Sequence, residues 1–258
     1  MSDSAVVVAI PARLASSRLP GKVLADIGGR PMLQHVVDRC RLARGVDALV
    51  VCTDSPVVER AAEAWGVKAL LTPQHCSSGS ERLAAVIPAL LAAGGGAAEH
   101  TLVINVQADQ PLLDPAIIEG MVARFSALGR PEVITPVYPL AATKLHDPNV
   151  VKVLRAADGR AITFSRSALP HVRDLTPERW AERTTYWGHV GLYGYRGDVL
   201  AGWNALPPSS LEDLEKLEQL RLIEAAIPIH TFEVDQDCLS VDTAEQLEQA
   251  RALLVGQA

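Results

Sequence analysis

The chain has 258 residues, of which 48% are hydrophobic and 21% are charged, a composition typical of a folded globular protein. Its formal net charge of −6 argues against a nucleic-acid-binding surface, which normally has a net basic face. The 4 cysteines form no C-x-x-C pair, so we expect reduced thiols rather than a metal cluster or a disulfide framework. The sequence contains no signal-peptide pattern and no apolar run long enough to cross a bilayer, and we therefore expect a cytoplasmic protein.

The first half of the chain alternates short apolar runs with segments of helical periodicity. Several helices have proline in the first turn, and Ser78 and Glu81 stand at capping-box spacing. Strands are predicted at Ala5–Ile10, Ala48–Cys52, Lys68–Leu71 and Thr101–Val106, and helices at Pro31–Arg41, Ser55–Trp65, about Ser80–Leu91 and from Asp114 onward. This alternation predicts an α/β fold with a mainly parallel, Rossmann-like sheet and helices on both faces.

The pattern changes after about Val133. Two strand-like runs flank Asp158-Gly159, a strong hairpin signal, so we expect an antiparallel segment at about 133–198, appended to the sheet of a single domain spanning 1–258. The remaining expected elements are strands at Val150–Leu154, Ala161–Ser165, Gly188–Tyr195 and His230–Val234, a mobile loop at Val172–Thr185, and helices at Leu211–Ala225 and Thr243–Leu253.

A basic loop follows the first predicted strand directly. It starts at Pro11 and carries Arg13, Arg18 and Lys22, with Gly21 to let the backbone approach a ligand closely. Ligands of open α/β sheets bind beyond the carboxyl ends of the strands, and guanidinium and ammonium groups suit a polyphosphate. The alternative is a solvated loop that only bears surface charge. The chain has neither a P-loop nor a G-x-G-x-x-G motif, which makes an NAD-dependent oxidoreductase improbable.

Motifs spread over nearly the whole chain resemble those of one enzyme family. They read IPARLASSRLPGKVLADIGGRPML, SSGSERL, VINVQADQPLLDP, DPNVVKV, ITFSRSALP, GHVGLYGYR, LEKLEQLR and SVDTAEQLEQAR. In this order they resemble the CMP-Kdo synthetases, or 3-deoxy-manno-octulosonate cytidylyltransferases. The resemblance implies a nucleotide-diphospho-sugar transferase-like fold and the reaction of CTP with the acidic sugar Kdo, giving CMP-Kdo and pyrophosphate for lipopolysaccharide or related surface polysaccharides. It also implies a homodimer formed through the antiparallel segment.

Two aspartates are the expected ligands of the Mg²⁺ cofactor. Asp109 follows the strand Thr101–Val106, and Asp242 precedes the last predicted helix. Magnesium typically takes one or two carboxylates together with phosphate oxygens and water. Taken singly, Asp109 could be a turn residue and Asp242 a helix cap. The family resemblance implies that both bind the metal and that Arg18 and Lys22 join them in catalysis, stabilising the departing pyrophosphate.

The resemblance also implies two sets of binding residues. For the nucleotide they are Pro11, Ala12, Arg13, Arg18, Lys22, Ser78, Gly79, Ser80, Arg82 and Gln107, and for the sugar Arg166, His189, Tyr193, Glu218 and Gln219. An arginine is the expected partner of a sugar carboxylate. From the residues alone, Arg82 could instead pair with a neighbouring carboxylate on the helix surface. Tyr193 and His189 could be packing residues of a strand, and Glu218 and Gln219 could be solvated on a charged helix.

One departure from the family pattern bears on the substrate. The family commonly has VQGDEP around the metal-binding aspartate, where this chain has Ala108 and Gln110 beside Asp109. This leaves three hypotheses open: CMP transfer to Kdo, transfer to another acid such as 8-amino-Kdo or a sialic acid, or a non-catalytic nucleotide-binding regulator. The presence of both aspartates counts against the regulator.

Overall fold

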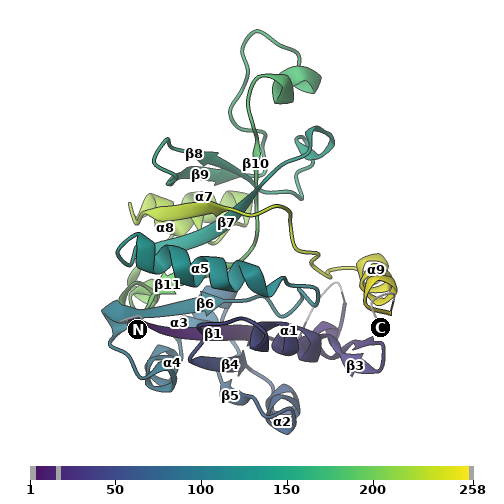
Figure 1. The fold of residues 1–258 in the computed structure, drawn as a ribbon, viewed down its shortest axis with the longest axis vertical. Coiled ribbons are helices and arrows are strands. Elements are labelled where there is room, and N and C mark those ends of the chain that lie inside the picture. Colours follow the sequence, from purple (N-terminus) through teal and green to yellow (C-terminus); the bar gives the residue numbers. More distant parts are fainter. Residues whose placement is uncertain (1–3, 16–18, 256–258) are drawn as a thin grey trace. The chain divides into compact units, whose positions relative to one another are not determined.

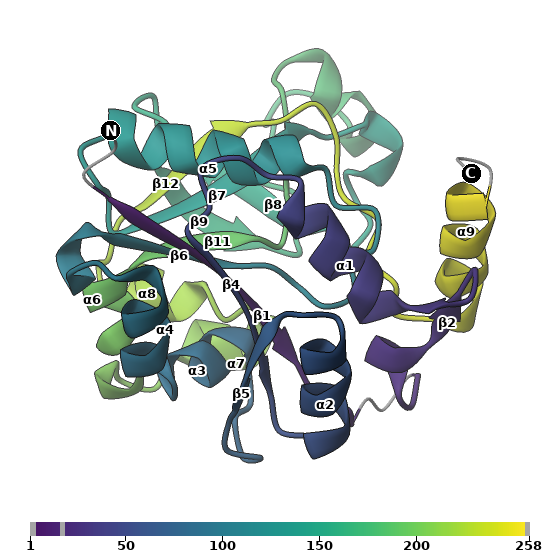
Figure 2. The same ribbon diagram turned by 60° about the horizontal axis from the view of Figure 1, so that its bottom comes forward.

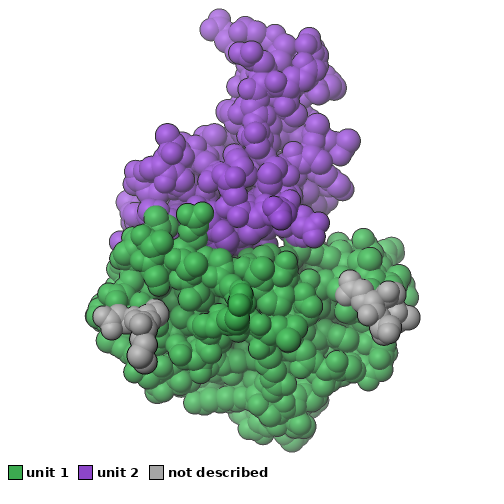
Figure 3. Space-filling view, viewed as in Figure 1, with its two compact units in different colours: residues 1–130, 192–204, 238–258 green, residues 131–191, 205–237 purple. Residues whose placement is uncertain are grey.

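The computed structural model describes residues 4–15 and 19–255, and the chain forms two compact units. Unit 1 comprises residues 1–130, 192–204 and 238–258, and unit 2 comprises residues 131–191 and 205–237 (Figure 3). The single domain expected from the sequence stays a prediction. No helix in the described ranges is long and apolar enough to cross a membrane.

Unit 1 is built on a mainly parallel sheet whose strands run in the order β5-β4-β1-β6-β11. β1, β4, β5 and β6 are parallel, and β11 pairs with β6 in the antiparallel direction. The strands are β1 (Ala5–Ala12), β4 (Ala48–Thr53), β5 (Lys68–Leu71), β6 (Thr101–Asn105) and β11 (Tyr193–Arg196). Every residue of β6 is buried, as expected for a strand covered on both faces. The predicted α/β class is confirmed.

Several helices of unit 1 begin where the sequence places caps. Ser55 and Asp114 accept hydrogen bonds from the backbone at the starts of α2 and α5, each followed by proline. The helices are α1 (Met32–Arg41), α2 (Pro56–Ala64), α3 (Gly79–Ala84), α4 (Ile87–Gly94), α5 (Pro115–Ala127), α6 (Gly197–Ala201) and α9 (Ala244–Val255), with short 3-10 turns η1 (Lys22–Leu24), η2 (Ala98–His100) and η5 (Trp203–Ala205). A two-strand ribbon, β2 (Asp26–Ile27) and β3 (Arg30–Pro31), precedes α1 (Figure 1).

The order of the strands creates a switch point beside β1. The chain passes from β1 to β4 and β5 on one side, and then returns across the sheet to β6 on the other side. Right-handed crossovers in opposite directions place α1 and the pair α3–α4 on opposite faces, as Figure 2 illustrates. The carboxyl ends of β1 and β6 therefore flank the crevice in which open α/β sheets bind ligands.

The helix expected at about Ser80–Leu91 is two helices, α3 and α4. Val86 has a non-helical backbone between them, and Pro88 lies in the first turn of α4. Proline has no N–H to donate and its ring clashes with the carbonyl four residues earlier, so one continuous helix cannot run through Pro88. The result is a short α3 that starts at Gly79 and ends at Ala84.

Unit 2 is built on β7 (Val133–Pro139), β8 (Lys152–Arg155), β9 (Ala161–Ser165), β10 (Trp187–His189) and β12 (Ile229–Glu233). β7, β10, β8 and β9 pair in this order and are antiparallel. Gly159, with φ of 83°, turns β8 into β9, which confirms the predicted hairpin. β12, which lies outside the predicted antiparallel segment, pairs with β7 in the parallel direction.

Three further expectations for this part of the chain are corrected. The run Gly188–Tyr195 forms two strands, β10 and β11, which belong to different units. The helix expected at Leu211–Ala225 is α7 (Ser210–Glu215) and α8 (Leu220–Glu224), because Lys216 adopts a left-handed conformation with φ of 54°. The expected loop Val172–Thr185 contains the 3-10 helix η4 (Pro177–Glu182), whose Trp180 is buried against Leu145 and Tyr186. A further 3-10 turn, η3, covers Ala142–Lys144.

Candidate active site

A pocket of about 310 Å³ opens in unit 1 at the carboxyl ends of β1 and β6. Its walls come from the loop after β1, the start of α3, the turn after β6 and the segment before α9. It is lined by Pro11, Arg13, Lys22, Val23, Cys76, Ser77, Ser78, Gly79, Arg82, Gln107, Ala108, Asp109 and Asp242. Basic and acidic side chains therefore share one small cavity at the switch point of the sheet.

Lys22 lies between the two predicted metal ligands. Its Nζ donates to Asp109 Oδ2 at 2.6 Å and to Asp242 Oδ1 at 2.9 Å. Burial by itself lowers the pKa of Lys22, but the charges and hydrogen bonds of Asp109 and Asp242 outweigh it, so the pKa is raised. The ammonium is therefore held in its charged form, and both carboxylates face one cationic nitrogen.

Gly21 gives the backbone the turn that brings Lys22 to this place. Its φ of 68° is left-handed, which favours glycine, and it precedes the 3-10 turn that starts at Lys22. A Cβ at Gly21 would meet no atom within 4 Å. The reason for glycine here is therefore the backbone conformation, and the close approach expected from the sequence is not needed to explain it.

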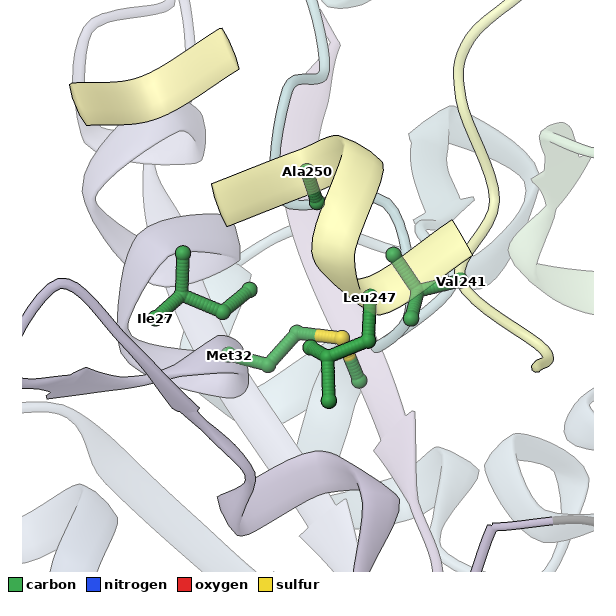
Figure 4. Packing of buried hydrophobic residues seen from close by; sticks show 5 residues of the cluster. All are labelled: Ile27, Met32, Val241, Leu247 and Ala250. Atoms are coloured by element: carbon green, nitrogen blue, oxygen red, sulfur yellow. The ribbon is translucent and has the colours of Figure 1, made fainter. Parts of the chain in front are cut away.

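A main-chain hydrogen bond and a small core position Asp242. Val241 N donates to Asp109 O at 2.8 Å, which ties the two aspartate-bearing segments together. The Val241 side chain is fully buried in a cluster with Ile27, Met32, Leu247 and Ala250, shown in Figure 4, of which the last two belong to α9. Burial of such apolar side chains stabilises the segment, so Asp242 is placed by the packing of the residue before it.

The cap of α9 is Thr243. Its Oγ1 accepts from Gln246 N, and the Gln246 side chain accepts from the backbone N–H groups of Asp242 and Thr243. This is a capping box, and it leaves the Asp242 carboxylate to bond with Lys22. The alternative interpretation of Asp242 as a helix cap is wrong.

The start of α3 forms the opposite wall of the pocket. Ser78 Oγ accepts from Glu81 N, as the capping-box spacing predicts, while the Glu81 carboxylate accepts from the N–H and hydroxyl of Ser77. A Cβ on Gly79 would lie only 3.2 Å from Pro11 Cγ and 3.3 Å from Asn105 Nδ2. Glycine thus lets this helix end pack closely against the strands.

Arg82 is a buried arginine of α3. Its Nη2 donates to Asp54 Oδ2 at 3.0 Å, and its Nη1 also bonds to Thr72. The side chain of Arg82 is only 3% exposed, so the ion pair with Asp54 compensates for its burial. The alternative of a partner on the helix surface is wrong, because the carboxylate that pairs with Arg82 follows β4.

The structure brings most of the predicted nucleotide-binding residues into this pocket. Pro11, Arg13, Lys22, Ser78, Gly79, Arg82 and Gln107 line it. Ala12 and Ser80 do not belong to that lining within the described chain, because both are fully buried, and Ser80 Oγ is hydrogen-bonded to Tyr195 Oη at 2.7 Å. Arg18 lies outside the described residues.

Sequence reasoning missed several residues of the pocket. Val23, Cys76, Ser77 and Ala108 also line it. Ser77 could have been found from its place beside the predicted helix cap, since N-terminal residues of a helix direct their N–H groups at ligands. Cys76 and Val23 carry no such signal, because apolar and sulfur-containing residues usually belong to a core.

Arg166 and its surroundings form a polar cluster in unit 2. Arg166 Nε donates to Glu215 O at 2.7 Å and Nη1 to Pro148 O at 2.9 Å, so neutral carbonyl oxygens hold the guanidinium. The Glu215 carboxylate accepts from Ser165 Oγ at 2.6 Å and from Arg166 N at 2.8 Å. The predicted sugar-binding arginine is therefore oriented by the backbone.

The other predicted sugar-binding residues have different settings. His189 is hydrogen-bonded to Thr135 Oγ1 at 2.9 Å, and burial lowers the pKa of its imidazole to about 3. Glu218 and Gln219 lie in the turn between α7 and α8 and not on one charged helix, which corrects the expectation. Gln219 is 2% exposed, and its Nε2 has no hydrogen-bond partner within the described residues.

Tyr193 belongs to unit 1, unlike the other four residues of the predicted sugar set. It is 5% exposed and its ring stacks on Tyr195 at a centroid distance of 5.8 Å. Packing therefore accounts for the aromatic residue at this position, and its contact with a sugar stays a prediction.

Comparison with known proteins decides the family. The sequence model of the family described as Cytidylyltransferase matches residues 7–229. The 3-deoxy-manno-octulosonate cytidylyltransferase of Myxococcus xanthus is 42% identical over 98% of this chain and 98% of its own, and that of Escherichia coli is 41% identical over 97% and 96%. The chain belongs to the CMP-Kdo synthetase family.

Solved structures agree with this assignment. The structure of a CMP:2-keto-3-deoxy-manno-octonic acid synthetase complexed with CTP aligns with a TM-score of 0.89 and 40% identity, covering 99% of this chain and 100% of that one. A 4-diphosphocytidyl-2C-methyl-D-erythritol synthase aligns with a TM-score of 0.65 at 15% identity, which shows a common fold alone. The predicted nucleotide-diphospho-sugar transferase-like fold is confirmed.

Proposed function

We propose that the pocket of unit 1 binds CTP and that Lys22, Asp109 and Asp242 form the reaction centre. The chain is a 3-deoxy-manno-octulosonate cytidylyltransferase, which converts CTP and Kdo to CMP-Kdo and pyrophosphate. The observation that carries this proposal is the convergence of both aspartates on Lys22 Nζ, at 2.6 and 2.9 Å. Such a cluster at the switch point of an α/β sheet suits a charged phosphate ligand.

The nucleotide would be held by both polar walls of the pocket. Arg13 and Lys22 offer cationic donors to the triphosphate, with Arg18 as a further expected partner. Gln107 Nε2 donates to Asn105 Oδ1 at 3.2 Å, which fixes the orientation of the side-chain amide. The amide oxygen of Gln107 can then accept a hydrogen bond from the cytosine amino group.

The two carboxylates fit a magnesium ion. Both already face a single cationic nitrogen, and carboxylate oxygens are the ligands that Mg²⁺ prefers. Phosphate oxygens of the nucleotide and water molecules would complete the coordination shell of such an ion. Asp109 and Asp242 would hold the ion, which when bound would neutralise the triphosphate and make the attacking hydroxyl more acidic.

The anomeric hydroxyl oxygen of Kdo would attack the α-phosphorus of CTP. A bond forms between that oxygen and the α-phosphorus, the bond from the α-phosphorus to the bridging oxygen breaks, and pyrophosphate leaves while the hydroxyl proton passes to solvent. Positioning and charge neutralisation supply most of the rate enhancement in such a reaction. Lys22 would stabilise the negative charge that builds up on the leaving pyrophosphate.

The sugar acid would be recognised in unit 2 by Arg166, His189, Glu218 and Gln219. The Arg166 guanidinium is bonded to neutral carbonyls and so retains its charge for the sugar carboxylate. The depressed pKa of His189 keeps its imidazole neutral, which suits a hydroxyl group rather than a carboxylate. The unpartnered Nε2 of Gln219 is a further donor for a sugar oxygen.

The experiment that tests this is pyrophosphate release from CTP and Mg²⁺ with Kdo, 8-amino-Kdo, a sialic acid or no sugar. We expect release with Kdo alone, which would also show that Ala108 and Gln110 are tolerated beside Asp109. Asp109→Asn should lower kcat by about a thousandfold, because an electrostatic group at the reaction centre is lost. Glu63→Gln, an exposed site on α2, is the control. Near-normal turnover by D109N would refute the proposed centre.

Homodimer formation and a cytoplasmic location stay predictions for this chain. Light scattering of the purified protein would test the first, with a mass near twice that of the 27.6 kDa chain as the expected result.

A further inference from the structure

Lys152 is a fully buried lysine in unit 2. It is the first residue of β8 and 0% exposed, a rare position for a lysine without a dedicated set of partners. Its Nζ donates to Asp147 O at 2.9 Å and to Val150 O at 2.7 Å. Burial lowers the pKa of Lys152 more than the nearby Asp147 and Glu215 raise it. The side chain thus crosslinks the two ends of one turn.

The same turn holds the guanidinium of Arg166. Val150 N bonds to Asp147 O at 3.2 Å, which closes the turn, and Pro148 O accepts from Arg166 Nη1 at 2.9 Å. Carbonyl oxygens of a four-residue turn therefore accept from both cations. The turn therefore supplies one of the two carbonyl oxygens that hold the Arg166 guanidinium, and Glu215 O supplies the other.

In the sheet, Lys152 lies between two residues that each directly precede a residue of the proposed sugar site. On one side it pairs with Ser165 of β9, which precedes Arg166, and on the other with Gly188 of β10, which precedes His189. Side chains opposite one another on neighbouring strands share a face of the sheet. Ser165 Oγ in turn binds the Glu215 carboxylate, so one row of residues supports the polar cluster.

We infer that Lys152 is a positioning residue for the sugar carboxylate: it clamps the 147–150 turn, and the turn directs the guanidinium of Arg166. Because the Lys152 side chain is fully buried, it acts through Arg166 and does not contact the substrate. This inference rests on the proposed role of Arg166 in binding the sugar acid.

Lys152→Met tests the inference, because methionine keeps much of the length and loses the donors. Steady-state kinetics should show the KM for Kdo raised about tenfold, as for a loss of about 1.4 kcal/mol in binding. The KM for CTP and kcat should stay within about twofold, since the nucleotide pocket is built from other residues. Lys68→Met, at an exposed lysine of β5, is the control.

The double variant K152M/R166M separates positioning from a general loss of structure. If Lys152 acts through Arg166, the KM for Kdo of the double variant equals that of R166M alone. Additive effects, or an unchanged KM in K152M, would overturn the inference. A normal KM in R166M would refute the sugar-binding role of Arg166 itself, so the two failures are distinguishable.

If circular dichroism shows that K152M does not fold, Pro148→Gly tests the turn instead, because Pro148 is an exposed residue of that turn. It keeps the carbonyl group and removes the rigid ring, and the KM for Kdo should rise about threefold with an unchanged KM for CTP. Unchanged values for both substrates would overturn the inference.

Discussion

Lys22 in unit 1 and Lys152 in unit 2 both have largely buried side chains, but their pKa values shift in opposite directions. Lys22 bonds to the carboxylates of Asp109 and Asp242, which raise its pKa against the effect of burial. Lys152 bonds to two main-chain carbonyl oxygens, and burial lowers its pKa. The opposed charge of the partner, and not the depth of burial alone, decides the direction.

The difference in partners suggests a difference in role. Carboxylate partners are side chains that can exchange one cation for another, so Lys22 and its aspartates suit a site that receives a charged ligand. Carbonyl partners belong to the backbone and cannot leave without unfolding the turn, so Lys152 suits a fixed support. Unit 1 therefore carries the reactive charges, while the polar cluster of unit 2 is held by its main chain.

Among the variants that compare the two units, Lys22→Met is expected to have the largest effect. Removing the ammonium leaves Asp109 and Asp242 without their shared cation and removes a donor from the pocket, so kcat/KM for CTP should fall about a hundredfold. Pyrophosphate-release kinetics measure this, with K152M as the contrasting variant that leaves the KM for CTP unchanged. Equal losses for CTP in both variants would remove the distinction between a reactive and a supporting lysine.

Gly188→Ala should destabilise unit 2 by about 2 kcal/mol, because a Cβ there would overpack the site. This Cβ would lie 2.6 Å from Tyr138 Cε1 and 2.7 Å from Tyr138 Oη, and the ring would have to move. Urea unfolding measures the change in free energy. Gly191→Ala is the matched control, since a Cβ there meets no atom within 4 Å. Similar losses for both variants would contradict the steric explanation.

His189 should make stability fall as the solution becomes acidic. Its pKa in the folded chain is about 3, well below the ordinary value of 6.5, so the unfolded chain binds the proton first. The loss begins below about pH 6.5 and approaches about 1.4 kcal/mol per pH unit until about pH 3. Urea unfolding between pH 7 and pH 5 should show that the free energy of unfolding changes less with pH in His189→Gln than in the unaltered chain. The control is His75→Gln, at an exposed histidine. If the free energy of unfolding of H189Q depended on pH as in the unaltered chain, His189 would not be the source of the pH dependence.

The smallest effect is expected from Thr243→Ala, which removes the cap of α9. A lost threonine cap typically lowers the free energy of unfolding by about 1 kcal/mol, and turnover should change less than in Asp242→Asn. Asp242→Asn should do the reverse, with a large loss of kcat and little change in unfolding by urea. A large loss of stability in D242N would restore the helix-cap interpretation of that aspartate.

Much of unit 1 was predictable because its signals are local. β-branched runs, prolines in first turns and the caps Ser55, Ser78 and Asp114 mark strands and helices within a few residues. The basic loop after β1 was recognisable for the same reason, since a strand followed directly by cationic residues is visible in sequence. Even the missed break between α3 and α4 had a local sign in Pro88.

What the tertiary structure alone decided is which distant groups meet. Lys22 and Asp242 are separated by 220 positions, yet they share a hydrogen bond because Val241 is packed beneath α9 and bonded to Asp109 O. The left-handed Lys216, the parallel pairing of β12 with β7 and the burial of Lys152 likewise depend on packing between segments far apart in the chain. Local patterns determine where elements begin and end, whereas the charges that make the site are brought together by long-range packing, which no short stretch of sequence encodes.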